Sequence, residues 1–407
     1  MNSKQKIKLL AIIILAFLVK MRYIGTKAWE CVWAIKEADF HIILKCKGKC
    51  PYCYVDLQHA TETIFNNCQT NVCTLRNALK IITKLRFVAG AQDLVFVGGD
   101  PCLHPNLAEM IIFAKLIGLN TCILSNTHRY MMAGEEIDLR KVMPYIDELD
   151  FTLHGLPADH NAFNQMPGSY EKAFEQLRAF RDGRTEKQAI GIVLNMVPST
   201  IGTPSYLQGM MAGAISRLGL VPGLDFFTIQ RIAFKGAGSI DCQKWRITPE
   251  MLSGAFDIFD RIAKSYEIET KCCIDTVPWC ALPERHWHYL EPLMGGCNWG
   301  KPGGVLSIMP DGNIQRCALC SEHLGVNIAE MKDYSGFAEF MQTNPTLVAV
   351  KEHKHLSDKC LKCSFLNQCG GGCIVANTSD GRICDPYSCG PNNVPRGMDY
   401  LAPGFND

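Results

Sequence analysis

The chain has 407 residues, of which 47% are hydrophobic and 20% charged, so it can bury a large core in more than one domain. Its formal net charge of +1 gives no general basic field, which argues against a nucleic-acid partner. Twenty-one cysteines, an odd number in a long chain, are typical of metal clusters rather than of a secreted disulfide framework. Because iron–sulfur clusters need thiolates and a low-potential electron source, we expect a protein of the reducing cytoplasm.

The N-terminal segment 1–22 is the first distinct element. Its uncharged centre, Leu9 to Val19, is too short to cross a bilayer unaided, since a spanning helix needs about 20 apolar residues. Lys8 and Lys20 flank this centre, and we expect them to hold the segment on anionic headgroups at the inner face of the membrane. A signal peptide is disfavoured because no small-residue cleavage box follows. A helix packed on the protein's own core is the alternative.

From residue 39 onward, strand and helix patterns alternate. Strands are predicted at 39–45, 93–97, 120–124, 149–153, 190–197 and 226–232, and helices at 74–87, 106–116, 139–145, 170–181 and 206–218. This order predicts parallel strands with outer helices, an α/β fold in the form of a partial (β/α)6 barrel. Sites in that architecture lie at the carboxyl ends of the strands.

The loop after the first strand reads Cys46-x3-Cys50-x2-Cys53. Three thiols at this spacing can surround a [4Fe–4S] cluster and leave one iron open for a small molecule. A zinc knuckle or scattered core thiols are the alternatives, but zinc prefers paired cysteines that close four ligands. With Tyr52 directly before the last cysteine, the motif resembles the signature of the radical SAM superfamily. The resemblance implies that S-adenosylmethionine (SAM) binds the open iron through its amino and carboxylate groups.

The resemblance also implies SAM contacts at the ends of later strands. Gly98-Gly99-Asp100-Pro101 resembles the family's Gly-Gly-Glu-Pro motif, which holds the methionine amino group, with Asp100 in place of Glu. Thr152 keeps a hydroxyl that contacts the ribose in the family, but Asn164 stands where an Arg pairs the carboxylate. Because an amide cannot make that bidentate ion pair, either Arg231 supplies the charge or the carboxylate is held neutrally. The candidate SAM-binding residues are Tyr52, Gly98, Gly99, Asp100, Pro101, Asn126, Thr152 and Asn195.

The C-terminal third holds a second set of cysteines. Cys297 precedes Gly312 and Cys317, and farther on stand Cys360-x2-Cys363-x5-Cys369-x3-Cys373 and then Cys389. The turn residues 310–312 predict a hairpin between strands at 305–309 and 313–316. The spacings resemble the SPASM domain, which carries two auxiliary iron–sulfur clusters. A zinc ribbon is the alternative for residues 360–373.

The SPASM resemblance implies which cysteines share a cluster. It assigns Cys297, Cys317 and Cys373 to one auxiliary cluster, and Cys360, Cys363, Cys369 and Cys389 to the other. The first set lacks a ligand, for which Cys280 is our choice ahead of Cys273 and Cys272, with an open iron as the alternative. Cys384 competes with Cys389 in the second set.

These features divide the chain into an N-terminal anchor at 1–22, a radical SAM barrel at 23–245, a helical linker at 246–295, a SPASM domain at 296–395 and a tail at 396–407. The resemblance implies an oxidoreductase that uses SAM and three [4Fe–4S] clusters, with a flavodoxin- or ferredoxin-type electron donor. It cleaves SAM to a 5′-deoxyadenosyl radical and oxidatively modifies a peptide or protein, for example by cross-linking or dehydrogenation. Radical modification of a lipid or other small molecule at the membrane is the alternative. A protein that only carries electrons has no use for an open cluster iron.

Overall fold

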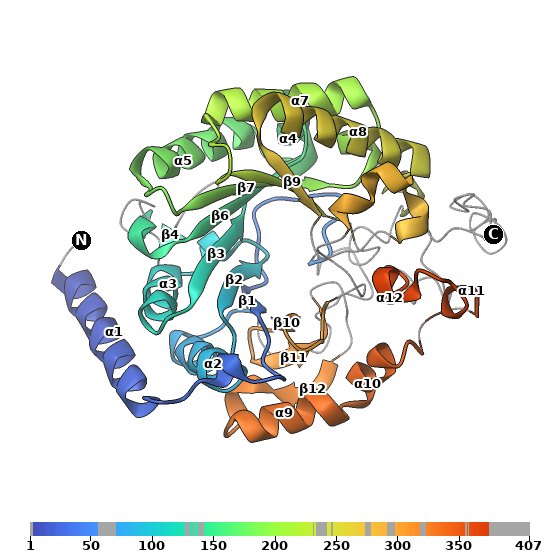
Figure 1. The fold of residues 1–407 in the computed structure, drawn as a ribbon. Helices are drawn as coiled ribbons and strands as arrows, with labels where there is room; N and C mark the ends of the chain where they lie inside the picture. The colour runs from blue at the N-terminus through green and yellow to red at the C-terminus, as the bar shows by residue number, and fades with distance from the viewer. Residues whose placement is uncertain are drawn as a thin grey trace.

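The computed structural model describes residues 3–55, 71–126, 131–132, 135–136, 142–230, 232, 242–245, 247–272, 278–290, 298–317, 323–354, 356 and 358–373. A ten-stranded sheet bends into an open arc with most helices on its outer side (Figure 1). The strand order along the sheet is β12-β11-β10-β1-β2-β3-β6-β7-β8-β9. A separate small hairpin pairs β4 (Met131–Met132) with β5 (Glu135–Glu136).

A run of neighbouring strands in this sheet is parallel. These strands are β1 (Glu37–Ile43), β2 (Asp93–Gly98), β3 (Asn120–Ser125), β6 (Glu148–Leu153), β7 (Ala189–Asn195), β8 (Phe226–Gln230) and β9 (Glu269–Cys272). Helices occupy the crossovers that parallel strands require: α2 (Leu75–Phe87), α3 (Leu107–Leu116), α4 (Pro157–Asn164), α5 (Ser169–Gly183), α6 (Pro198–Ile201), α7 (Pro204–Leu218) and α8 (Pro249–Tyr266). The predicted partial (β/α)6 barrel is confirmed by the six parallel strands β1, β2, β3, β6, β7 and β8.

Two predicted segments differ in the structure. The expected helix at 139–145 lies partly outside the described residues, and its described end is a 3-10 turn, Met143–Tyr145. Pro144 in this turn has no amide hydrogen to bond to a preceding helical turn. The expected helical linker at 246–295 contains α8 but also β9, which pairs with β8 and extends the parallel sheet.

The helix α2 shows how local sequence produces these elements. The side chain of Thr74 accepts a hydrogen bond from the backbone N–H of Asn77, which caps the first turn. Leu79, Ile82 and Leu85 lie on the side of the helix that faces the core, where they are buried. The capped, amphipathic segment therefore covers the outer face of the sheet.

The N-terminal helix α1 (Ser3–Arg22) packs against α3 at the left edge of Figure 1. Ile12 and Ala16 are buried on its inner face, and Lys8 Nζ lies 2.6 Å from a carboxylate oxygen of buried Glu109. This cover explains why α3 is apolar nearly all round. The alternative of a helix on the protein's own core is therefore correct for this inner face.

The outer face of α1 is apolar and exposed. Its exposed apolar side chains are Ile7, Leu10, Ile13, Ile14, Leu15, Phe17, Leu18 and Met21. No helix among the described residues is both long and apolar enough to cross a bilayer.

The C-terminal segment joins the barrel through its first strand. The predicted hairpin is confirmed as β10 (Val305–Ile308) and β11 (Asn313–Gln315), which pair antiparallel, while β10 also pairs in parallel with β1. Gly312 makes the turn at φ +93°, and a Cβ there would lie 2.6 Å from the side-chain oxygen of Asn327. The remaining elements are β12 (His323–Asn327), α9 (Tyr334–Thr343), α10 (Pro345–Lys351), α11 (Asp358–Leu361) and α12 (Leu366–Cys369).

Candidate active site

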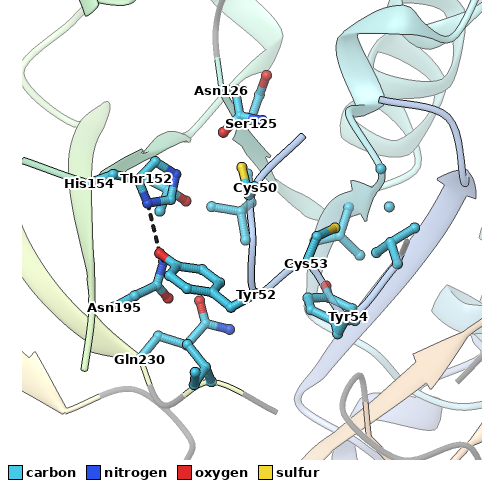
Figure 2. Close-up of a pocket in the computed structure, with 16 residues that line it drawn as sticks. Cys50, Tyr52, Cys53, Tyr54, Ser125, Asn126, Thr152, His154, Asn195 and Gln230 are labelled. Atoms are coloured by element: carbon cyan, nitrogen blue, oxygen red, sulfur yellow. Dashed lines mark hydrogen bonds between the residues drawn. The ribbon is translucent and has the colours of Figure 1, made fainter. Parts of the chain in front are cut away.

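A pocket lies where the central parallel strands end on the carboxyl side of the sheet (Figure 2). The strand ends that line it contribute Gly98, Ser125, Thr152, Asn195 and Gln230. The cysteine loop forms another wall through residues of 50–55. The structure thus brings the loop and the strand ends together, at the edge where the sequence predicted a site.

The thiols of Cys46 and Cys50 flank Gly48, and the Cys53 thiol lies near both of them. A Cβ added at Gly48 would lie 3.6 Å from Cys46 Sγ and 3.7 Å from Cys50 Sγ, so both thiols face the same small residue. Burial raises the pKa of the Cys46 thiol to about 12 and the pKa of Cys50 well above its ordinary value, and the nearby Cys53 thiol adds to both shifts. Such crowded thiols ionise together when a metal supplies positive charge, so the donor set fits an iron–sulfur cluster.

Gly98 and Gly99 allow backbone to approach backbone. A Cβ on Gly98, at φ +143°, would lie 2.0 Å from the carbonyl oxygen of Ile43, and a Cβ on Gly99 would lie 2.4 Å from that of Lys45. The Gly99 amide donates to the Ile43 carbonyl at 2.7 Å. The sequence predicted that these glycines admit a ligand. In the structure they line the pocket and also admit the chain that leads into the cysteine loop.

Asp100 faces the protein interior. It is 2% exposed, and its Oδ1 accepts hydrogen bonds from Ser125 Oγ at 2.8 Å and from the Cys102 amide at 3.2 Å. Burial raises the pKa of Asp100, and the hydrogen bond from Ser125 opposes that rise. Pro101 begins the short 3-10 helix that Asp100 caps. Asp100 therefore ties the turn after β2 to the end of β3.

Tyr52 joins the cysteine loop to two strand ends. Figure 2 shows its hydroxyl directed at His154 and Asn195, with heavy-atom distances of 2.7 Å to His154 Nδ1 and 2.7 Å to Asn195 Nδ2. Its ring packs against Phe163 and Trp245, with ring centroids 4.8 Å and 5.4 Å apart. Tyr52 and Asn195, both predicted as SAM contacts, therefore also fix each other's positions.

The other predicted contacts take different positions around the pocket. Asn126 lines it, and its Nδ2 lies 3.8 Å from Cys46 Sγ. Thr152 lines it from β6, whereas Asn164 is fully buried and does not belong to the described lining. Arg231 lies outside the described residues. Direct contact of these residues with SAM stays a prediction.

No role was predicted from the sequence for His154 and Gln230, which line the pocket. His154 holds the Tyr52 hydroxyl, and Gln230 ends β8 at the pocket wall. Gln230 could have been found from its place near the end of the predicted strand at 226–232. No sequence pattern indicates that His154 pairs with Tyr52, because the two residues are far apart in the chain.

The described auxiliary cysteines fall into unequal environments. Cys317 and Cys373 are buried and Cys363 is exposed, while Cys297, Cys384 and Cys389 lie outside the described residues. The resemblance led us to expect Cys280 with Cys317 and Cys373.

The structure places Cys280 near Cys369, a cysteine of the other predicted set. The backbone N–H of Trp279, the neighbour of Cys280, donates to Cys369 Sγ at 3.5 Å. Burial raises the pKa of Cys369 to about 12, and the thiols of Cys280 and Cys360 add to the shift. The role of Cys280 as the missing ligand of the first set stays a prediction.

Comparison with known proteins agrees with the loop motif. Residues 41–198 match the family model of the Radical SAM superfamily. The S-adenosylmethionine-dependent nucleotide dehydratase of Flammeovirga pacifica is 32% identical over 92 residues, which are 23% of this chain and 30% of that protein. The chain therefore spans less than a third of that relative. The AdoMet-dependent heme synthase of Oleidesulfovibrio alaskensis is 22% identical over 292 residues, 69% of this chain and 70% of that protein.

A solved structure shares the fold. Streptococcus suis SuiB bound to S-adenosylmethionine has a TM-score of 0.62 at 13% identity, over 86% of this chain and 76% of SuiB. The family match spans the segment from the end of β1 to the start of α6, which contains the three clustered thiols and most of the pocket wall. The segment 41–198 therefore matches the radical SAM superfamily in sequence, and the likeness to SuiB shows a shared fold over most of the chain.

Proposed function

We propose that the chain is an oxidoreductase that uses SAM to modify a peptide or protein. The gathering of Cys46, Cys50 and Cys53 beside a pocket at the strand ends carries this proposal. The peptide substrate draws support from SuiB, whose structure bound to the precursor peptide SuiA has a TM-score of 0.61 and covers 88% of this chain. Low identity limits that likeness to the fold, so the substrate class needs its own experiment.

The chemistry divides between the bound groups and the protein. A [4Fe–4S] cluster on the three thiols, reduced by an external low-potential donor, would supply the electron that splits SAM into methionine and a hydrogen-abstracting radical. The protein holds the pocket in shape: Tyr52 anchors the loop, and Asp100 with Ser125 anchors the turn after β2. Asn126 and Thr152 present polar side chains to the pocket, where SAM would lie.

Two auxiliary clusters complete the proposal. The seven cysteines of the SPASM spacing supply their thiolates, and an oxidised cluster near the substrate would accept the electron that a substrate radical gives up. Burial of Cys317 and Cys373 and the grouping of Cys360 with Cys369 support cluster sites in this region. The count of two clusters rests on the spacing.

Iron counting and product analysis test this function. Anaerobically reconstituted protein should hold about twelve irons, and the Cys46→Ala, Cys50→Ala and Cys53→Ala triple variant about eight. The triple variant should form no 5′-deoxyadenosine. Continued formation at the wild-type rate would show that the SAM site lies elsewhere.

The substrate is tested separately. The enzyme, SAM and a reductant are incubated with peptides encoded beside its gene, and mass spectrometry follows the peptides. Loss of two hydrogens from a peptide, with one 5′-deoxyadenosine for each event, supports peptide oxidation. Modification confined to a lipid or other small molecule from the same cells would contradict it.

A second candidate function is the radical modification of a lipid or small molecule at a membrane surface. The exposed apolar face of α1 favours it, since a helix that is apolar on most sides is normally covered. Lys6 and Lys20 are exposed near the two ends of this face, which suits anionic headgroups. The heme synthase relative, named for a small-molecule product, points the same way.

Vesicle binding tests this second candidate. Wild-type protein should sediment with vesicles that contain anionic lipid, and Phe17→Glu should reduce the bound fraction severalfold by placing a charge in the apolar face. Val221→Glu, which charges an exposed apolar residue elsewhere, is the matched control. Equal binding by all three proteins, or binding by none, would contradict the proposal that the apolar face of α1 binds a membrane.

A further inference from the structure

Asn164 is the last residue of α4 and reaches the cysteine loop. Its backbone carbonyl accepts a hydrogen bond from the Lys49 amide at 3.1 Å, and its Oδ1 lies 3.2 Å from Cys50 Sγ. On the other side, its Nδ2 lies 2.8 Å from Nε2 of His160. Both Asn164 and His160 are fully buried, so no solvent molecule can replace these partners.

The backbone directly after β6 determines which nitrogen of His160 carries a hydrogen. The backbone N–H of His154 points at His160 Nδ1 at 3.2 Å, and a backbone N–H can only donate. Nδ1 must therefore accept, so a neutral His160 ring carries its hydrogen on Nε2. That Nε2–H group then needs an acceptor, and the facing group is the amide of Asn164.

This requirement sets the orientation of the Asn164 amide. An NH2 group facing the Nε2–H of His160 would place two donors 2.8 Å apart. A half-turn of the amide directs Oδ1 at His160 and Nδ2 at Cys50 Sγ. The same half-turn suits an iron-bound Cys50, because its thiolate has no hydrogen to donate and would repel an oxygen.

We propose that Asn164 is a positioning residue that donates a side-chain N–H···S hydrogen bond to the thiolate of Cys50 in the cluster-loaded protein. The inference rests on the proposed function, since it needs the cluster at Cys46, Cys50 and Cys53. A hydrogen bond to a cluster sulfur stabilises the more negative, reduced state and so raises the reduction potential. At the position where the family resemblance places an Arg for the SAM carboxylate, this chain has a residue that acts on the cluster.

The reduction potential of the cluster tests this role. The signal to follow is the electron paramagnetic resonance that changes when SAM is added, because only a cluster with an open iron responds. Asn164→Leu removes the donor without adding charge and should shift the potential to a more negative value. Asn164→Asp adds negative charge beside the sulfur and should shift it further. The control, Asn161→Asp, makes the same change one turn earlier, where Oδ1 accepts from Ser169 and Tyr170, and should leave the potential unchanged.

Iron content separates this inference from the proposed function. Wild-type protein without a SAM-responsive cluster would contradict the proposed function, whereas an intact cluster whose potential is unchanged in Asn164→Leu would contradict only the inference. A second measurement needs no variant to fold. With 15N in the asparagine side chains, wild-type protein should show two hyperfine couplings between 15N and the reduced cluster. One comes from Asn164 and the other from Asn126, which lies near Cys46. The absence of any such coupling in wild-type protein would overturn the proposal, and so would a coupling that Asn164→Leu leaves unchanged and Asn126→Leu removes.

Discussion

The side-chain amide of Asn195 donates a hydrogen bond of 2.7 Å to the hydroxyl of Tyr52, so the cysteine loop is held directly by the end of β7. The same hydroxyl contacts His154 at the end of β6. A single oxygen atom therefore connects the loop to two neighbouring strands. Because Tyr52 stands between Cys50 and Cys53, this connection also positions the thiols.

Tyr52→Phe should destabilise the fold by about 1–3 kcal/mol, since it leaves buried polar atoms of His154 and Asn195 without their partner. Denaturant unfolding of the cluster-free protein measures the change. Tyr266→Phe, which removes a hydroxyl from an exposed residue, should change the free energy of unfolding by less than about 0.5 kcal/mol. Equal effects from the two variants would show that the Tyr52 hydroxyl is not important for stability.

Gly98→Ala should displace the chain that enters the cysteine loop. The added Cβ would lie 2.0 Å from the Ile43 carbonyl oxygen, and φ +143° is strained for alanine. We expect this variant to lose the iron bound at Cys46, Cys50 and Cys53, which metal analysis after reconstitution measures. Gly209→Ala, in α7 with open space around the new methyl group, should keep its iron and gain about 0.5–1 kcal/mol of stability. Full iron content in Gly98→Ala would contradict the proposed packing role.

A buried ion pair between Arg184 and Asp225 connects the segment before β7 to the start of β8. Both side chains are nearly inaccessible, and Asp225 also accepts hydrogen bonds from the amides of Ile190 and Val221. Arg184→Met leaves a buried carboxylate without its cation and should cost about 3–5 kcal/mol in the free energy of unfolding. Arg285→Met breaks an exposed pair with Asp257 and should cost less than about 1 kcal/mol. Calorimetry or urea unfolding distinguishes the two.

Glu37 should make the free energy of unfolding fall as pH rises from about 4.5 to about 7. Burial, with Asp93 and Glu148 nearby, raises the pKa of Glu37 from 4.5 to about 7. Between these values the folded protein binds more protons than the unfolded chain, so the free energy of unfolding decreases as pH rises from about 4.5 to about 7. Glu37→Gln removes this dependence and should make the protein more stable than wild type above pH 7, by about 1–3 kcal/mol.

Urea unfolding of both proteins at several pH values measures the effect of Glu37. The acidic neighbours Glu148 and Asp150 also have raised pKa values through burial, and the charge of Glu37 adds to the shift of Asp150, so the difference between the two proteins includes the loss of that repulsion. Parallel stability curves for wild type and Glu37→Gln would show that Glu37 does not titrate in this range.

Much of the barrel was predictable from local sequence patterns. Apolar runs marked the strands, as at β1 and β7, and helical spacing with a cap marked α2. The turn at Gly312 and the three-cysteine loop were equally local signals. Because a strand-helix alternation leaves few topologies, these signals sufficed for the carboxyl-end location of the site.

The partners of individual side chains were decided by the tertiary structure. The glycines at 98 and 99 were read as room for a ligand, yet they also admit the backbone of Ile43 and Lys45. Asn164 lacked a role in the sequence, and its contact with Cys50 appears once α4 packs beside the loop. Hydrogen-bond partners depend on which segments meet in space, and hydrophobic periodicity records only which face of a segment is buried.

The sequence by itself determined the family motif, the strand and helix order, and the edge of the sheet where the thiols lie. The tertiary structure decided that β10 pairs with β1, that one face of α1 covers α3, and that Cys280 lies near Cys369. The physical reason is the separation of the interacting residues along the chain. A motif depends on residues that are neighbours in the chain. Pairing between β1 and β10 joins residues that are far apart, and it depends on the packing of everything between them.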